Sequence, residues 1–388
     1  MGDHSEIVAG GTPNTGHPEY WNPKEIPWMS SGEINNKVIY STDNMISKIG
    51  FSNSSAKWVK EKSVLIALAG QGKTRGTVAI SEIPLTTNQS IAAIQPDSFL
   101  YYKFLFQNLE ERYNELREVS SGDGTRGGLN KQIISDLEVL APEIQEQIKI
   151  GDFLCGIDTL ITLHQRKYDK LTKVKKAMLE KMFPENGSPY PEIRFKGFTD
   201  AWEQHKLGEF ADIVGGGTPS TSNFEYWDGD IDWYAPAEIA DQIFVSSSER
   251  KITQQGYDNS SAKMLPVGTV LFTSRAGIGK TAILRKEGCT NQGFQSIVPH
   301  INELDSYFIF SRSEEMKRYG ETVGAGSTFV EVSGKQMANM ELMMPTTMEE
   351  QVTIGSFFRN LDSIITLHQR KLEKLKNIKK ACLEKMFV

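Results

Sequence analysis

The sequence of 388 residues repeats itself at an interval of about 206 residues, and this duplication limits the chain to two similar halves. The repeated stretches keep the same order in both halves. They pair residues 7–13 with 213–219, 20–21 with 226–227, 53–57 with 259–263, 87–89 with 290–292, and 161–167 with 365–371. Solenoid repeats have only roughly 20 to 45 residues, so each half should instead be a domain in its own right.

The composition is that of a globular protein. The chain has 43 Lys and Arg against 49 Asp and Glu, a formal net charge of −6, and 39% apolar residues. The surplus of negative charge and the lack of any apolar run near ~18 residues argue against a polycationic DNA-compacting protein and a membrane span. The chain opens without a secretory signal pattern, and Cys155, Cys289 and Cys382 form no C-x-x-C pair. These features indicate a soluble cytoplasmic protein without disulfides or a zinc site.

Each half consists of a globular part followed by one long helix. Short β-rich runs between Gly-rich turns, such as residues 64–68 and 270–273, predict a mixed α/β domain. From about residue 143 to 183 no proline intervenes, and a seven-residue repeat is present. One predicted seam position holds Ile150, Ile157, His164, Leu171 and Met178, and the other holds Phe153, Leu160, Lys167, Val174 and Lys181. The second half repeats this pattern, so we expect the two helices to pair with each other.

The predicted fold is therefore α+β, with two pseudo-symmetric mixed α/β domains joined by two long helices that form an antiparallel coiled coil. The predicted segments are a first globular domain at 1–142, a long helix at 143–183, a linker and lead segment at 184–206, a second globular domain at 207–345 and a second long helix at 346–388. Three prolines between residues 184 and 191 cannot continue a helix, which favours a linker there.

The sequence contains no complete catalytic motif. Residues 70–74 and 277–281 are similar to a phosphate-binding Gly-rich loop, but that motif needs glycine where Ala67 and Ser274 stand. The Asn/Asp/Ser-Pro-Pro-aromatic tetrapeptide of an adenine methyltransferase, a metal-nuclease acidic cluster and an H-x-x-x-H pair are all missing. We therefore predict no catalytic residue, no metal site and no cofactor in this chain.

Several short motifs occur in both halves in the same order. They are Gly-Gly-Thr-Pro, Tyr-Trp, a mid-domain Asn-Gln, and a Glu-Gln that enters a long helix ending in Leu-Glu-Lys-Met-Phe. With this combination, almost the whole chain resembles the specificity subunit of type I restriction-modification systems. The resemblance implies a non-catalytic protein that binds double-stranded DNA and recruits two methyltransferase subunits and the restriction subunits. S-adenosylmethionine, ATP and Mg²⁺ would then belong to those partners.

The resemblance also implies a bipartite DNA site, in which each target-recognition domain reads one half-site and the helices set the spacer. Half-sites read from one face of B-DNA should lie about 34 Å apart. Residues 14–17 differ from their counterparts at 220–223, so the half-sites should differ. A lead segment at 193–203 precedes the second domain, whereas residues 1–3 already align with 207–209.

Candidate DNA-binding residues are basic or amide side chains near the Gly-rich turns. Arg and Lys bind phosphates or the guanine edge, and Asn pairs with adenine. The candidates are Lys73, Arg75, Arg126, Asn130, Lys131, Arg275, Lys280 and Lys335. The paired Trp21, Trp28, Trp227 and Trp233 could stack on bases, but we expect them in the core because domains of different specificity share them. The Gly-Gly-Thr-Pro turn is expected to be architectural for the same reason.

Two other classes of function stay open. The chain could be a fused methyltransferase or NTPase with degenerate motifs, in which case the purified protein would bind S-adenosylmethionine or ATP. It could also be a duplicated scaffold that assembles proteins and never contacts DNA. Salt-dependent binding to a duplex separates a DNA-binding subunit from such a scaffold.

Overall fold

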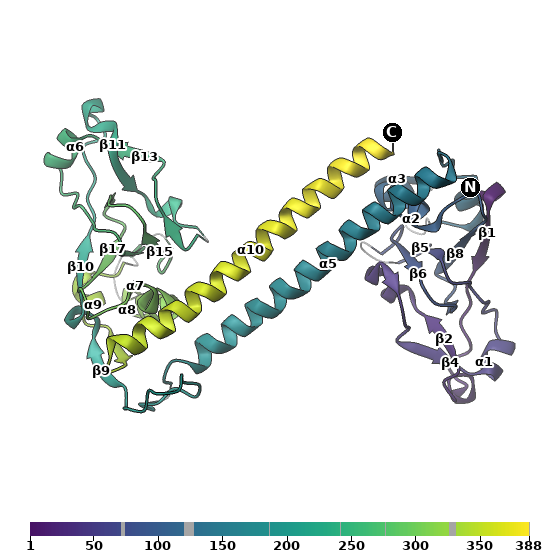
Figure 1. Ribbon diagram of the computed structural model, residues 1–388, viewed down its shortest axis with the longest axis horizontal. Coiled ribbons are helices and arrows are strands. Elements are labelled where there is room, and N and C mark those ends of the chain that lie inside the picture. Colours follow the sequence, from purple (N-terminus) through teal and green to yellow (C-terminus); the bar gives the residue numbers. More distant parts are fainter. Residues whose placement is uncertain are drawn as a thin grey trace. The chain divides into compact units, whose positions relative to one another are not determined.

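The computed structural model describes residues 1–70, 74–119, 128–185, 187–240, 242–275, 277–325 and 331–387 (Figure 1). It consists of two compact units, one formed by Met1–Arg166 with Gln369–Val388 and the other by Lys167–His368. Each long helix therefore contributes one part to each unit. The sequence-based segments, with whole helices at 143–183 and 346–388 beside the globular domains, stay a prediction.

The first unit is built on a five-stranded sheet in the order β1-β8-β5-β6-β3. Its strands are β1 (Ser5–Ala9), β3 (Val38–Ile39), β5 (Ser63–Ala67), β6 (Val78–Ser81) and β8 (Ile91–Pro96). Neighbouring strands are antiparallel except β3 and β6, which are parallel. Every residue of β5 and β6 is buried, because this sheet is covered on both faces.

Helices cover one face of this sheet, and a smaller sheet completes the unit. The covering helices are α2 (Tyr102–Glu111), α3 (Tyr113–Val119) and α4 (Lys131–Asp136), whereas α1 (Lys48–Ser52) packs with the smaller sheet. The short 3-10 turns are η1 (Gly2–His4), η2 (Pro18–Tyr20) and η3 (Ser31–Asn36). Leu105 of α2 and Ile134 of α4 share a core with Ile94 of β8, whereas Ile34 of η3 packs on the opposite face with Leu65 of β5. The smaller sheet has the order β4-β2-β7, formed by β2 (Ile26–Met29), β4 (Asn44–Ile46) and β7 (Thr86–Thr87).

The second unit repeats this architecture, which confirms the predicted duplication. Its five-stranded sheet has the order β10-β17-β14-β15-β12, and its three-stranded sheet the order β13-β11-β16. The strands are β10 (Ala211–Gly215), β11 (Trp227–Tyr234), β12 (Phe244–Val245), β13 (Arg250–Ile252), β14 (Val270–Phe272), β15 (Thr281–Leu284), β16 (Cys289–Thr290) and β17 (Gln295–Pro299). The parallel pairs, β12 with β15 and β11 with β16, occupy the same places as in the first unit.

The remaining elements of the second unit include the lead segment. Its short helices are η4 (Leu207–Glu209), η5 (Phe224–Tyr226), η6 (Pro236–Glu238), α6 (Gln254–Asp258), α7 (Ser306–Ser311), α8 (Ser313–Gly324) and α9 (Gly334–Ala338). Strand β9 (Glu203–Lys206) ends the lead segment and pairs antiparallel with β18 (Glu341–Met344). Trp202 is buried next to Phe183 and Phe308, so the lead segment is part of the core of this unit.

The two long helices are α5 (Ile144–Lys181) and α10 (Met348–Met386). In the first unit the beginning of α5 lies beside the end of α10 and runs in the opposite direction (Figure 1). Leu154 and Ile157 of α5 share a core there with Leu383 of α10. In the second unit the chain just after α5 packs on the beginning of α10, where Phe183 stacks on Phe358. Each unit thus contains an antiparallel helix pair.

One of the two predicted seam positions is wrong. Phe153, Leu160 and Val174 are 49%, 46% and 36% exposed. The inward position lies one residue later, where Leu154 is fully buried. Residues three and four positions apart both return to nearly the same helix face. The prediction paired Ile150 with Phe153, three residues later, whereas the structure pairs it with Leu154, four residues later. No helix in the described ranges is long and apolar enough to cross a bilayer.

Candidate nucleic-acid interface

Four loops of the first unit meet at one edge of the domain through backbone hydrogen bonds. The amide of Gly11 donates to the carbonyl of Thr87 at 2.8 Å, and the amide of Leu68 donates to the carbonyl of Ser90 at 2.8 Å. The amide of Leu129 donates to the carbonyl of Leu68 at 3.1 Å. We call this region the loop edge, and its described residues fall within 10–13, 68–77, 87–90 and 128–131.

The second unit forms the same loop edge with equivalent bonds. Gly217 donates to Thr290 at 2.8 Å, Ser274 donates to Gly293 at 2.8 Å, and Val332 donates to Ser274 at 3.0 Å. The described residues of this edge fall within 216–219, 274–281, 290–293 and 331–335. The two units therefore present loops of different sequence from one common scaffold.

The Gly-Gly-Thr-Pro turn and the tryptophans hold the loop edge together. The indole of Trp28 donates to the carbonyl of Gly11 at 2.9 Å, and that of Trp233 donates to Gly217 at 2.8 Å. A Cβ atom on Gly11 would lie 2.3 Å from the hydroxyl of Ser55, so only glycine fits. Both indoles are buried, which confirms that these tryptophans belong to the core.

The three candidates of the second domain all lie on its loop edge. Arg275 is half-buried, and its backbone forms an isolated bridge with Glu331. The Nε atom of Arg275 lies 3.6 Å from the place of a Cβ on Gly293. Lys280 and Lys335 are exposed, and the amide of Lys280 donates to the hydroxyl of Thr273 at 2.9 Å. Three cationic side chains thus belong to one edge of this unit.

The candidates of the first domain are placed less uniformly. Arg75 is half-buried and Lys131 is exposed. The side chain of Asn130 accepts a hydrogen bond of 2.9 Å from the amide of Ile133, because it caps α4. Its amide oxygen is therefore committed to the fold. Lys73 and Arg126 lie outside the described residues.

Sequence reasoning missed one basic position beside each loop edge. In the first unit, the Cγ atom of Arg117 lies 3.5 Å from the place of a Cβ on Gly76. The same guanidinium lies over the ring of Tyr113 and donates to its hydroxyl at 2.7 Å. In the second unit, Lys317 of α8 packs on Gly279, where a Cβ would lie 2.5 Å from that of Lys317.

A weak sequence signal marks this position. Arg112-x-x-Glu115-x-Arg117 recurs as Arg312-x-x-Glu315-x-Lys317, now at an interval of 200 residues. In each copy the first arginine binds the glutamate three residues later. The hydrogen bonds from Arg112 hold the pKa of Glu115 below its ordinary value, against the opposing effect of burial. The same ion pair therefore stands at the start of the helix that carries the missed basic residue in each half.

The described residues contain no cluster of His, Cys, Asp or Glu that could hold a metal ion. Cys289 is buried, and burial raises the pKa of its thiol to about 11, so this sulfur is an unreactive core group.

The fold and the loop edges define a class, namely duplicated proteins with two α/β domains of one topology and two long helices. The sequence profile described as "Type I restriction modification DNA specificity domain" matches residues 1–173 and 199–377. The chain belongs to this family, with one match in each half.

Similar proteins support the assignment. The chain is 34% identical over 190 residues to the type I restriction enzyme MjaIX specificity subunit of Methanocaldococcus jannaschii, which covers 48% of this chain and 44% of the relative. It is 29% identical over 184 residues to the EcoR124I/EcoR124II specificity subunit of Escherichia coli, covering 45% and 44%. The match thus spans less than half the length of these relatives. The solved S subunit from M. genitalium has the same fold, with a TM-score of 0.64, 12% identity, and coverage of 100% of this chain and 94% of that one.

Proposed function

We propose that this chain is the DNA-recognition subunit of a type I restriction-modification complex in the cytoplasm. It binds an asymmetric bipartite site in double-stranded DNA, one half-site on each loop edge, and performs no chemistry itself. The observation that carries this proposal is the loop edge, because equivalent backbone hydrogen bonds present different loops in two domains of the same family.

Basic side chains at the loop edges support DNA binding. Arg75, Arg117 and Lys131 lie at the edge of the first unit or beside it, and Lys280, Lys317 and Lys335 do so in the second. Each is suited to a phosphate, because cationic groups that replace condensed counterions supply most of the affinity for a duplex. These contacts would position the domains without selecting a sequence.

Arg275 is the best candidate for reading a base. The equivalent backbone hydrogen bonds match Ser274 with Leu68 of the first unit. The residue that corresponds to Arg275 is therefore Ala69, so the arginine is present only in the second domain. A guanidinium can bind both acceptor atoms on the major-groove edge of guanine. Arg275 would therefore contribute to the half-site read by the second domain.

Exposed apolar residues on the long helices support partner recruitment. Leu160 and Leu163 of α5 are 46% and 57% exposed in the first unit, and their counterparts Ile364 and Leu367 of α10 are 45% and 49% exposed in the second. Exposed apolar groups at matching places indicate a protein-binding surface. We assign one methyltransferase subunit to each pair. Those subunits would supply S-adenosylmethionine, and the restriction subunits would supply ATP hydrolysis with Mg²⁺.

Exchange of residues 207–345 for those of a relative with a known target tests the proposal. The chain is produced with its methyltransferase, and methylated adenines are mapped across the genome. We expect one half-site to change while the other half-site and the spacer stay the same. The reciprocal exchange of residues 1–142 should change the other half-site. A change in both half-sites, or in neither, would contradict the proposal that each domain recognises one half-site.

A binding assay separates the alternatives. The purified chain should bind neither S-adenosylmethionine nor ATP in calorimetry, and micromolar binding of either would favour the enzyme reading. Its affinity for a target duplex should fall steeply with rising salt. If the chain binds no DNA, either alone or together with the methyltransferase, a protein scaffold would be favoured.

A further inference from the structure

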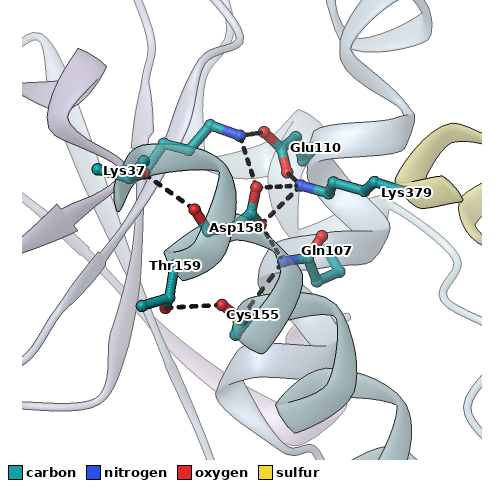
Figure 2. Close-up of polar contacts among 8 residues, drawn as sticks. Lys37, Gln107, Glu110, Cys155, Asp158, Thr159 and Lys379 are labelled. Carbon is teal, nitrogen blue, oxygen red and sulfur yellow. Dashed lines mark hydrogen bonds and ion pairs between the residues drawn. The ribbon is translucent and has the colours of Figure 1, made fainter. Parts of the chain in front are cut away.

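Within the first unit, a cluster of charges joins the end of α10 to α2 and α5 (Figure 2). The ammonium group of Lys379 donates to both carboxylate oxygens of Asp158 of α5, at 2.7 and 2.6 Å. Gln107 of α2 donates to the same carboxylate at 2.7 Å, while Glu110 binds both Lys379 and Lys37. The side chain of Lys379 is 8% exposed. This lysine is therefore a buried charge with its partners in place.

An equivalent pair lies in the second unit. Lys175 of α5 approaches Asp362 of α10 at 2.6 Å, and the hydroxyl of Tyr307 donates to the same carboxylate at 2.8 Å. The side chain of Asp362 is 7% exposed. Asp362 follows Asp158 by 204 residues, and Lys379 follows Lys175 by the same number. The two pairs are thus copies of one feature.

The geometry of these pairs is crossed. Each long helix carries an aspartate and, 17 residues later, a lysine, and each aspartate meets the lysine of the other helix. In each unit the contact joins α5 to α10 in the same antiparallel register. We call Asp158–Lys379 and Lys175–Asp362 the crossed pairs.

Stability alone is a poor explanation for buried ion pairs, because well-packed apolar residues often serve equally well. Polar residues at buried helix positions are better known for fixing register, since a shifted helix leaves them without a partner. A shift of α10 by seven residues would place Leu372 or Met386 opposite Asp158. The apolar residues recur every seven positions and discriminate weakly against such a shift, whereas the crossed pairs oppose it strongly.

We propose that the crossed pairs are positioning residues that set the register of α5 against α10, and thereby the spacer length between the two half-sites. The inference rests on the proposed function, because the spacer has meaning only for a bipartite DNA site. It assigns a specificity role to four residues that touch no DNA.

The test uses the Lys175–Asp362 pair, because fewer charges surround it. The full chain is produced with its methyltransferase as K175D, D362K, the exchanged double variant K175D/D362K, and the apolar double variant K175L/D362L. Lys176→Asp changes an exposed neighbour of Lys175 on the same helix and serves as the matched control. The spacer at every methylated site is read by sequencing, and thermal unfolding of each purified chain is recorded.

Each single reversal should lower methylation at the parent spacer at least tenfold, and the exchanged variant should restore it. The apolar variant should unfold within a few degrees of the parent chain yet methylate sites with more than one spacer length. The control should keep the parent spacer. The proposal would be overturned if the apolar variant methylated only sites with the parent spacer. It would also be overturned if the loss of methylation in the single reversals were explained by their loss of thermal stability.

Failure of the underlying function has a different signature. If the parent chain neither binds the duplex nor supports methylation, the DNA-recognition proposal itself fails. Thermal unfolding still reports on the crossed pair in that case, because the exchanged variant should recover the stability that each single reversal loses. The spacer at methylated sites therefore reports on the role in spacing, and thermal unfolding reports separately on the pairing of the two helices.

Discussion

Arg194 of the lead segment donates two hydrogen bonds, of 2.7 and 2.8 Å, to the carboxylate of Glu350 near the start of α10. The indole of Trp202 donates to the same carboxylate at 3.3 Å. The side chain of Glu350 is 2% exposed, so two residues of the lead segment, Arg194 and Trp202, donate to a buried charge. The hydrogen bonds that Arg194 donates to Glu350 keep the pKa of the guanidinium above its ordinary value.

Removal of this arginine should destabilise the second unit. Arg194→Ala leaves the buried carboxylate without its cationic partner and with only the indole of Trp202 as a donor among the contacts described above, which costs about 3–5 kcal/mol in the free energy of unfolding. Denaturant unfolding monitored by tryptophan fluorescence measures the loss. Glu146, the counterpart of Glu350 in the first half, is exposed, so Glu146→Gln is a matched control with an expected change below about 0.5 kcal/mol. Equal effects of the two substitutions would contradict this account.

Lys280 and Lys335 should contribute to DNA affinity without selecting a sequence. Substitution of either by alanine should weaken binding about equally on target and non-target duplexes, and should lower the slope of log affinity against log salt by about 1. Titrations at several salt concentrations measure the slope. Lys196→Ala removes an exposed lysine of the lead segment and should leave the slope unchanged. An unchanged slope in both loop-edge variants would remove these lysines from the interface.

Arg275 should act on one half-site only. Arg275→Ala should cost about 1–3 kcal/mol on the parent target and relax the preference at one base pair of that half-site. Competition binding with single-base variants of the target reads this directly. Lys335→Ala, which removes a charge from the same edge, should leave base preference intact. Uniform weakening on every sequence would make Arg275 another phosphate contact.

The exposed apolar pairs on the long helices should be needed for methyltransferase binding. Leu163→Asp and Leu367→Asp place a charge on a surface that we assign to the partner, so association should weaken by about tenfold or more. Analytical ultracentrifugation with the purified methyltransferase measures the association. Gln369→Asp adds the same charge at a neighbouring exposed position and is the control. DNA binding by the isolated chain should survive in all three variants.

Acid should remove the contribution of Asp158. Burial raises the pKa of this carboxyl, but the charges of Lys37 and Lys379 and the hydrogen bonds from Lys379 and Gln107 lower it below the ordinary 3.8. Its stabilisation is therefore present above that ordinary value and is lost as the pH falls through the lower pKa of the folded state. Asp158→Asn should lower the melting temperature at neutral pH and flatten its fall in acid. Glu180→Gln, at an exposed site on α5, should leave the profile unchanged.

The duplication and the seven-residue repeats were sufficient to predict two similar α/β domains and two long helices. The long helix expected at 143–183 corresponds to α5 (Ile144–Lys181). Of the shared tryptophans, Trp28, Trp227 and Trp233 are buried as expected, whereas Trp21 is only partly buried against the same core. The contact between Lys379 and Asp158 could not be foreseen, because 221 residues separate them and heptad periodicity does not distinguish one turn of a helix from the next. Arg117 was missed because its repeat falls at an interval of 200 rather than 206 residues. The face of α5 was misjudged because spacings of three and four residues look alike in sequence.

The loop edge is held by hydrogen bonds between backbone atoms, such as those from Gly11 to Thr87 and from Gly217 to Thr290. Such bonds are indifferent to the side chains that the loops carry, provided that the glycines remain. Mutation can therefore alter the outward-facing residues of either domain while the scaffold persists. New surface chemistry at either loop edge thus requires only a few substitutions, and the hydrogen bonds that hold the backbone in place are kept.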